Sequence, residues 1–246
     1  MPGFASLIAP RPVLQALQPL RRLIHRTAQS SRAIPGGRLY LGEGQPIIVF
    51  PAFGGGPETT ASLRSTLSAA GFAAYDWGQG ADRGPGPFSL NRCLRRLEEQ
   101  VIEVFEDARQ PVTLLGGGLS GVYARELAKR ITPLVRQVIT LGTPFNINAE
   151  GARRCAMLAP LHGPEGHVDA ALSFRLRQRP PVPCTSIYSL SDETVPWQMC
   201  VETESAESEN IKLAVPYRQL PQSPKVLEII THRLAQPKDE WRPFEA

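Results

Sequence analysis

Short apolar runs alternate with longer amphipathic stretches along most of this chain. Runs with the length and composition of buried strands cover residues 46–50, 72–77, 112–115, 138–141, 185–189 and 210–213. Helical patterns cover residues 58–70, 89–108, 120–129 and 224–234. We expect Thr59 or Thr60 to cap the first of these helices. Because strands and helices alternate, we predict an α/β fold with a mostly parallel central sheet and helices on both faces.

Residues 146–180 interrupt this alternation, because they are polar, punctuated by prolines and without a strand pattern. We interpret them as a small cap or lid insertion within a single α/β domain that spans residues 41–246. A chain of 246 residues is long enough for one such domain with a substantial core.

The first 40 residues lie outside the alternating region, and we predict a helical segment packed on the domain. Apolar residues recur there at helical spacing, namely Val13, Leu14, Leu17, Leu20, Leu23 and Ile24. Arginines 21, 22 and 26 fall on another side of the same helix. The alternative is that residues 1–30 form a basic amphipathic helix that touches a membrane surface or a partner.

The composition excludes several classes of protein. No apolar run approaches the roughly 20 residues of a membrane span, and the start of the chain lacks the layout of a secretory signal. A net charge of +4, from 27 basic and 23 acidic residues, is too small and too scattered to indicate nucleic acid. The four cysteines show no metal-ligand spacing. We therefore expect a cytoplasmic protein without a metal or another cofactor.

The segment PVTLLGGGLSGVYARELA, residues 111–128, has the layout of a nucleophile elbow, in which a strand, a sharp glycine turn and a helix follow one another. In the pattern G-x-S-x-G, Gly116 takes the first glycine and Gly118 takes the place of the nucleophile. Leu119 follows, and Ser120 stands where the second small residue is expected. The elbow therefore has no serine at its apex.

Four segments, taken together and in this order, resemble the α/β-hydrolase superfamily of bacterial serine esterases and lipases over residues 45–235. IIVFPAFGGG (47–56) is similar to its first strand and oxyanion loop, and LLGGGLSGVYARELAKR (114–130) to its elbow and helix. VITLGTPF (138–145) resembles the next strand, and SIYSLSDETVPW (186–197) the strand and loop that carry the acid. The resemblance implies a nucleophile, an acid and a histidine in this chain order.

The resemblance places the acid at Asp192, just past a strand end, although a loop aspartate that caps a turn is the alternative. It places the nucleophile at Gly118, which has no side chain and cannot form an acyl intermediate. An elbow apex has a positive φ angle that costs a residue with a Cβ atom about 1–3 kcal/mol, and glycine avoids this cost. Ser120 is an alternative, shifted nucleophile, but packing or capping of the helix is the role that its position favours.

The position of the triad histidine carries no histidine either. His232, the only histidine after Asp192, falls within the closing helix. Tyr217 stands in AVPYRQL, where the resemblance implies a Gly-Ser-His-type segment. A phenol with an ordinary pKa of about 10 is a poor general base near neutral pH. His162 and His167 lie in the predicted cap and precede the acid.

An oxyanion-type site remains after these losses. The resemblance implies that the backbone N–H groups of Phe53 and Leu119 converge at the mouth of the sheet. Because Gly118 is small, we expect a larger space in front of them than an esterase has. Such a pocket would hold a carboxylate or a carbonyl group without attacking it.

We therefore expect a pseudoenzyme with a degenerate catalytic triad, which binds a small apolar or acyl ligand or acts as a regulatory subunit with a protein partner. The first alternative is acid–base chemistry in the same pocket, by Asp192 with Tyr217 or with a histidine of the cap. The second alternative is an esterase-like hydrolase that uses Ser120.

Overall fold

The computed structural model describes residues 42–85, 90–162, 168–191, 194–237 and 240–244. The predicted N-terminal helical segment lies outside the described residues, and so do Asp192 and His167. Among the helices that are described, none has the length and apolar character needed to cross a membrane.

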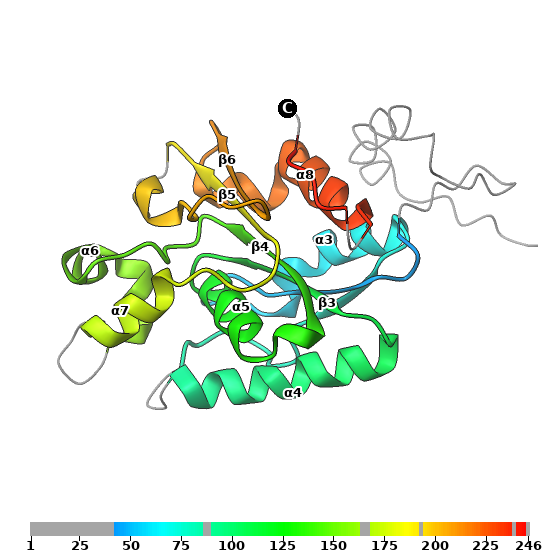
Figure 1. The fold of residues 1–246 in the computed structure, drawn as a ribbon, viewed down its shortest axis with the longest axis horizontal. Helices are drawn as coiled ribbons and strands as arrows, with labels where there is room; N and C mark the ends of the chain where they lie inside the picture. The colour runs from blue at the N-terminus through cyan, green and yellow to red at the C-terminus, as the bar shows by residue number, and fades with distance from the viewer. Residues whose placement is uncertain (1–41, 86–89, 163–167, 192–193, 238–239, 245–246) are drawn as a thin grey trace, which may run out of the picture.

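Six strands form one sheet in the order β2-β1-β3-β4-β5-β6, and every neighbouring pair is parallel (Figure 1). The strands are β1 (Pro46–Val49), β2 (Ala73–Asp76), β3 (Val112–Gly117), β4 (Val135–Leu141), β5 (Cys184–Ser189) and β6 (Ser208–Leu213). Each predicted run is a strand, so the predicted parallel sheet is confirmed. The strand order reverses between β1 and β3, where the carboxyl edge of an open sheet commonly holds a ligand.

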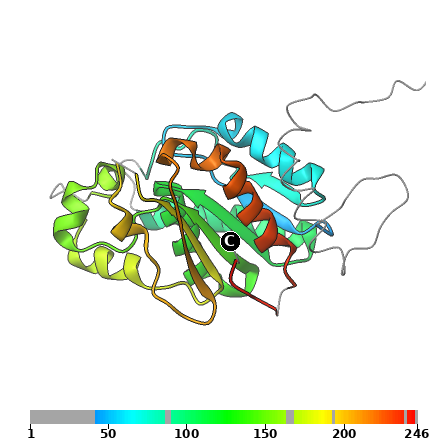
Figure 2. The same cartoon turned by 90° about the horizontal axis from the view of Figure 1, so that it is seen from above.

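Helices cover both faces of the sheet, as predicted. The α-helices are α3 (Pro57–Ala69), α4 (Leu90–Ala108), α5 (Leu119–Arg130), α6 (Ala149–Arg154), α7 (Ala170–Arg177) and α8 (Pro224–Ala235). The 3-10 helices are η1 (Thr132–Leu134), η2 (Ala156–Leu161), η3 (Trp197–Cys200) and η4 (Tyr217–Gln222). Figures 1 and 2 show α4 and α5 on one face and α3 and α8 on the other.

Alternation along the central strands builds a separate core on each face. Ile48 and Leu114 belong to the core under α4 and α5, whereas Ile47, Leu115 and Ile139 belong to the core under α3 and α8. All of them are almost fully buried. Successive residues of a strand point to opposite faces, so a sheet covered on both sides needs continuous apolar strands.

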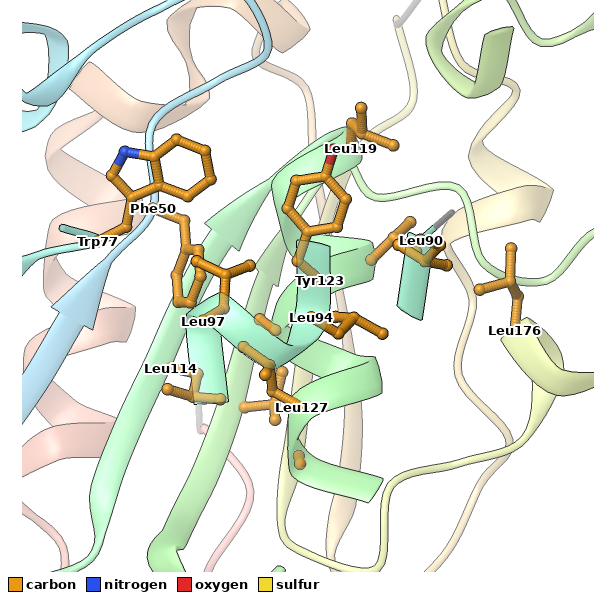
Figure 3. Close-up of a cluster of buried hydrophobic side chains, with 14 of the residues drawn as sticks. Phe50, Trp77, Leu90, Leu94, Leu97, Leu114, Leu119, Tyr123, Leu127 and Leu176 are labelled. Carbon is orange, nitrogen blue, oxygen red and sulfur yellow. The ribbon is translucent and has the colours of Figure 1, made fainter. Parts of the chain in front are cut away.

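The core under α4 and α5 extends to the carboxyl edge of the sheet. Phe50 and Trp77, which follow β1 and β2, meet edge to face with ring centroids 6.3 Å apart. Figure 3 shows the Tyr123 ring among leucines of α4 and α5, with its hydroxyl at the Leu119 end of the cluster. This packing fixes α5, and with it the turn at Gly118, against the sheet.

Residues 146–180 contain α6, η2 and α7 and, in their described part, no strand. This segment leaves the sheet after β4 and returns at β5, and α6 and α7 lie beside each other in Figure 1. Its role as a cap or lid stays a prediction.

The start of α3 differs from the expectation that Thr59 or Thr60 caps it. The N-cap residue is Gly56, no side chain caps the helix, and Pro57 is the first helical residue. The Thr59 hydroxyl instead donates to the Gly56 carbonyl at 2.7 Å. The prediction was wrong because the fixed φ angle of Pro57 already favours a helix start there.

Candidate functional site

The turn between β3 and α5 has the shape that the elbow pattern predicts. Gly118 follows the last residue of β3 and precedes the first residue of α5, with φ 56° and ψ −126°. Its N–H donates to the Leu141 carbonyl of β4 at 3.0 Å. This positive φ angle strains any residue with a Cβ atom, so glycine suits the apex on backbone grounds alone.

Two further glycines let α5 pack closely on β3. An ideal Cβ atom at Gly116 would lie 2.8 Å from the Gly121 nitrogen. One at Gly121 would lie 2.0 Å from the Thr143 hydroxyl oxygen and 2.9 Å from the Gly116 carbonyl oxygen. The elbow therefore keeps the close strand–helix contact of its pattern, with a glycine at its apex.

Tyr217, the first residue of η4, fills the space in front of Gly118. An ideal Cβ atom at Gly118 would lie 2.4 Å from the Tyr217 hydroxyl oxygen and 2.6 Å from the Met157 sulfur. One at Gly142 would lie 2.5 Å from the Tyr217 ring. The expectation of an enlarged space at the apex is therefore wrong, because two side chains from distant parts of the chain occupy it.

Residues of η2 pack against two glycines, Gly118 and Gly84. Met157 lies at Gly118, and an ideal Cβ atom at Gly84 would lie 2.8 Å from Pro160 and 3.3 Å from the Phe53 ring. Phe53 is nevertheless 49% exposed. Met157 and Pro160 were not predicted, because nothing in the sequence indicates which residues of the 146–180 segment reach Gly118 and Gly84.

Ser120 lies inside the first turn of α5 and has no exposed surface. Its hydroxyl donates to the Gly117 carbonyl at 3.0 Å and accepts from the Gly117 N–H at 3.3 Å. These contacts favour the structural role that its position suggested over a role as nucleophile.

The loop that carries Phe53 is tied to the loop after β2. The Gly54 N–H donates to the Asp82 carbonyl, and the Asp82 N–H donates to the Gly55 carbonyl, both at 2.8 Å. Leu119 is the first residue of α5, so its N–H has no acceptor within the helix. Convergence of this N–H with that of Phe53 stays a prediction.

The remaining candidates lie apart from the elbow or outside the described residues. His232 lies in α8, as predicted, with its ring edge-on to Phe244 at 5.2 Å. His162 directly follows η2, and its buried Nε2 atom has no hydrogen-bond partner among the described residues. Asp192 and His167 are not described. In the described ranges, no three His, Cys, Asp or Glu side chains are grouped so that they could hold a metal ion.

A buried carboxyl group, that of Asp82, lies in the loop after β2. Asp82 is 1% exposed, and its Oδ1 atom accepts from the Gly84 N–H at 2.8 Å. Its Oδ2 atom has no partner in the described part of the chain, and neither does the hydroxyl of fully buried Tyr123. Burial raises the pKa of Asp82, while the Gly84 N–H opposes the rise.

This pKa shift predicts that Asp82→Asn stabilises the protein near neutral pH. Because the pKa of Asp82 is raised in the folded state, its favourable contribution is present at acid pH and is lost as the pH rises through that folded-state value. Asparagine keeps an acceptor for the Gly84 N–H without a buried charge. We expect a higher melting temperature for Asp82→Asn at pH 8, and a difference that shrinks towards pH 4.

Asp76→Asn is the matched control, because Asp76 also accepts from the N–H two residues on, at Gly78, but in an exposed position. We expect no gain in melting temperature for it at pH 8. A lower melting temperature of Asp82→Asn than of the wild type at pH 8 would show that the carboxylate stabilises the fold.

The comparisons with known proteins agree with this architecture. No family model matches the chain, and no curated protein matches it. Among solved structures, it is similar to a monoacylglycerol lipase of Paleococcus ferrophilus, with 13% identity, a TM-score of 0.55, and coverage of 78% of this chain and 96% of that one.

Two further structures show the same likeness. The chain is similar to lipase B of Aspergillus fumigatus, with 14% identity, a TM-score of 0.60, and coverage of 82% of this chain and 55% of that one. It is also similar to a lipase-esterase related protein of Clostridium acetobutylicum, with 15% identity, a TM-score of 0.55, and coverage of 76% and 93%. The parallel sheet, the elbow turn at Gly118 and these likenesses show that the chain has the α/β-hydrolase fold.

Proposed function

We propose that this protein has the hydrolase fold without the serine mechanism and acts as a binding or regulatory protein. The observation that supports the proposal is the content of the elbow apex. Gly118 has no side chain, and the Tyr217 hydroxyl and the Met157 sulfur lie where the side chain of a nucleophile would project. A covalent acyl intermediate needs a hydroxyl or thiol at that point.

An acyl or small apolar compound is the ligand class that we propose for this site. The side chains next to the ideal Cβ positions of Gly118 and of Gly84 are Tyr217, Met157, Pro160 and Phe53, all of them uncharged. Backbone N–H groups at the start of α5 suit a carbonyl or carboxylate oxygen. Three of the similar structures are named as lipases or as related to lipases and esterases, which agrees with an acyl ligand.

Labelling with a fluorophosphonate probe, followed by peptide mapping, tests the proposal. We expect no serine adduct, while an active serine esterase treated in parallel is labelled. Ser120→Ala should leave the result unchanged. An adduct on Ser120, or robust ester hydrolysis that Asp192→Asn abolishes, would overturn the proposal in favour of an esterase.

Acid–base chemistry without a covalent step is the second candidate. It is supported by the Tyr217 hydroxyl, which lies at the apex beside the first turn of α5. In this case turnover would show a pH–rate profile that changes in Tyr217→Phe, without a burst of acyl-enzyme. A burst would point to a nucleophile. An absence of turnover would favour the binding role.

A further inference from the structure

We infer that a second site, between α5 and the end of α7, binds a phosphate group. Four cationic side chains from these two places form it, namely Arg125, Lys129, Arg175 and Arg179. Arg125 and Lys129 lie roughly 10 and 16 Å beyond Gly118 along the axis of α5. The site is therefore separate from the elbow apex, and it goes beyond the proposed function.

Hydrogen bonds hold the end of α7 against α5, which it contacts (Figure 1). The Lys129 amine donates to the Arg175 carbonyl at 2.7 Å and to the Gln178 carbonyl at 3.4 Å. The Arg125 guanidinium donates to the same Gln178 carbonyl at 3.3 Å. A carbonyl oxygen has no net charge, so these bonds gather the cations in one place without neutralising them.

Arg179 faces the same interior as the cations of α5. The thiol of Cys184, at the start of β5, is almost fully buried, and burial raises its pKa to about 12. The positive charges of Arg125, Arg179 and Lys129 all oppose this rise in the pKa. Because three cations act on one buried thiol, the cation that follows α7 lies close to those of α5.

The cluster contains more cations than carboxylates. Glu202 forms an ion pair with Arg125, while Lys129 and Arg175 share one carboxylate, that of Glu126. Within the described ranges, the fourth cation forms no ion pair. Four positive charges therefore face two negative ones, which leaves an excess of two positive charges.

Two of the guanidinium groups also contain a buried nitrogen without a hydrogen-bond partner. Arg125 is 2% exposed, and its Nε atom has no partner among the described residues. The same is true of the buried Nη1 atom of Arg179. A guanidinium has N–H donors only, so another cation cannot satisfy these atoms. A buried charged donor without a partner is costly, which indicates an anionic acceptor at this point.

A phosphate group matches the charge and the donors of the cluster. A phosphate monoester carries about 1.5–2 negative charges at neutral pH, which balances the excess of two. Its oxygens accept hydrogen bonds, and a guanidinium binds them through two parallel N–H···O bonds. A carboxylate carries one charge and would balance half of the excess. Because Arg125 is buried, we expect a small soluble phosphate compound instead of a lipid headgroup.

Calorimetric titration with inorganic phosphate tests the inference on the full chain, Arg179→Gln and Arg175→Gln. We expect an affinity at least about tenfold lower in both variants, because each loses a charge-assisted hydrogen bond to the anion. Acetate, titrated at the same ionic strength, should bind the wild type more weakly than phosphate. Arg177→Gln, at an exposed position of α7, is the matched control and should bind phosphate as the wild type does.

Melting curves without phosphate separate a structural role from a binding role. A purely structural role of Arg179 would lower the melting temperature and leave the affinity for phosphate unchanged. Arg175→Gln carries the test if Arg179→Gln does not fold, because the Arg175 side chain is 39% exposed. Wild-type protein that does not bind phosphate, or equal binding in the wild type and the folded variants, would overturn the inference.

Sedimentation with phosphatidylcholine vesicles, with and without phosphatidate, tests the source of the phosphate group. We expect no binding to either kind of vesicle that depends on Arg179. Binding to phosphatidate vesicles that Arg179→Gln abolishes would overturn the assignment to a soluble compound and would identify a lipid headgroup.

Discussion

Replacing Gly118 by serine is expected to destabilise the protein and to leave it without esterase activity. The φ angle of +56° strains any residue with a Cβ atom by about 1–3 kcal/mol. The new side chain would also meet the Tyr217 hydroxyl and the Met157 sulfur, but both atoms are the far ends of flexible side chains, so their shift adds little to this cost. We expect a loss of about 1–3 kcal/mol in the free energy of unfolding, measured by urea denaturation.

Gly44→Ala separates the two contributions. Gly44 has a φ angle of +73°, but an ideal Cβ atom there would have no neighbour within 4 Å. It should therefore show the backbone strain alone. Adding Tyr217→Ala to Gly118→Ser should make the double variant more stable than the sum of the single effects predicts. A Gly118→Ser variant that is as stable as the wild type and hydrolyses esters would contradict this description of the apex.

The sequence predicted the order and type of the main elements because their apolar patterns are strong and local. The runs at β1 and β4 are continuous and buried on both faces, which is the pattern of a central parallel strand. The prediction was weaker at boundaries, since β3 extends two residues beyond the apolar run, to Gly117. Glycine has no apolar side chain, so a hydrophobic pattern does not indicate that Gly116 and Gly117 belong to the strand.

The candidate site was predictable only where a motif defined it. The elbow pattern located Gly118, and the segment after β6 located Tyr217, which the structure brings to that glycine. The filling of the apex by side chains was not predictable, because Met157 and Gly142 come from other stretches of the chain and approach Tyr217 only in the folded state. Whether a glycine at the apex leaves an open space in front of it depends on such contacts between residues far apart in the sequence.

Glu202→Gln is expected to destabilise the protein strongly. Glu202 forms an ion pair with Arg125 of α5, and both side chains are almost completely buried. The Arg125 guanidinium also stacks over the Phe145 ring, 3.5 Å from its centroid. Loss of the carboxylate would leave a buried cation without its counter-charge, which typically costs about 3–5 kcal/mol. Urea denaturation at neutral pH measures this loss.

Two comparisons decide whether the uncompensated charge is the cause. Glu240→Gln removes a carboxylate from an exposed pair with Arg242 at 3.4 Å and should cost at most about 1 kcal/mol. Arg125→Met combined with Glu202→Leu removes both charges and should be less destabilising than Glu202→Gln alone. If the double variant were the less stable one, the packing of Arg125 on Phe145, and not its charge, would hold the middle of α5 in place. The position of the elbow would then depend on that packing.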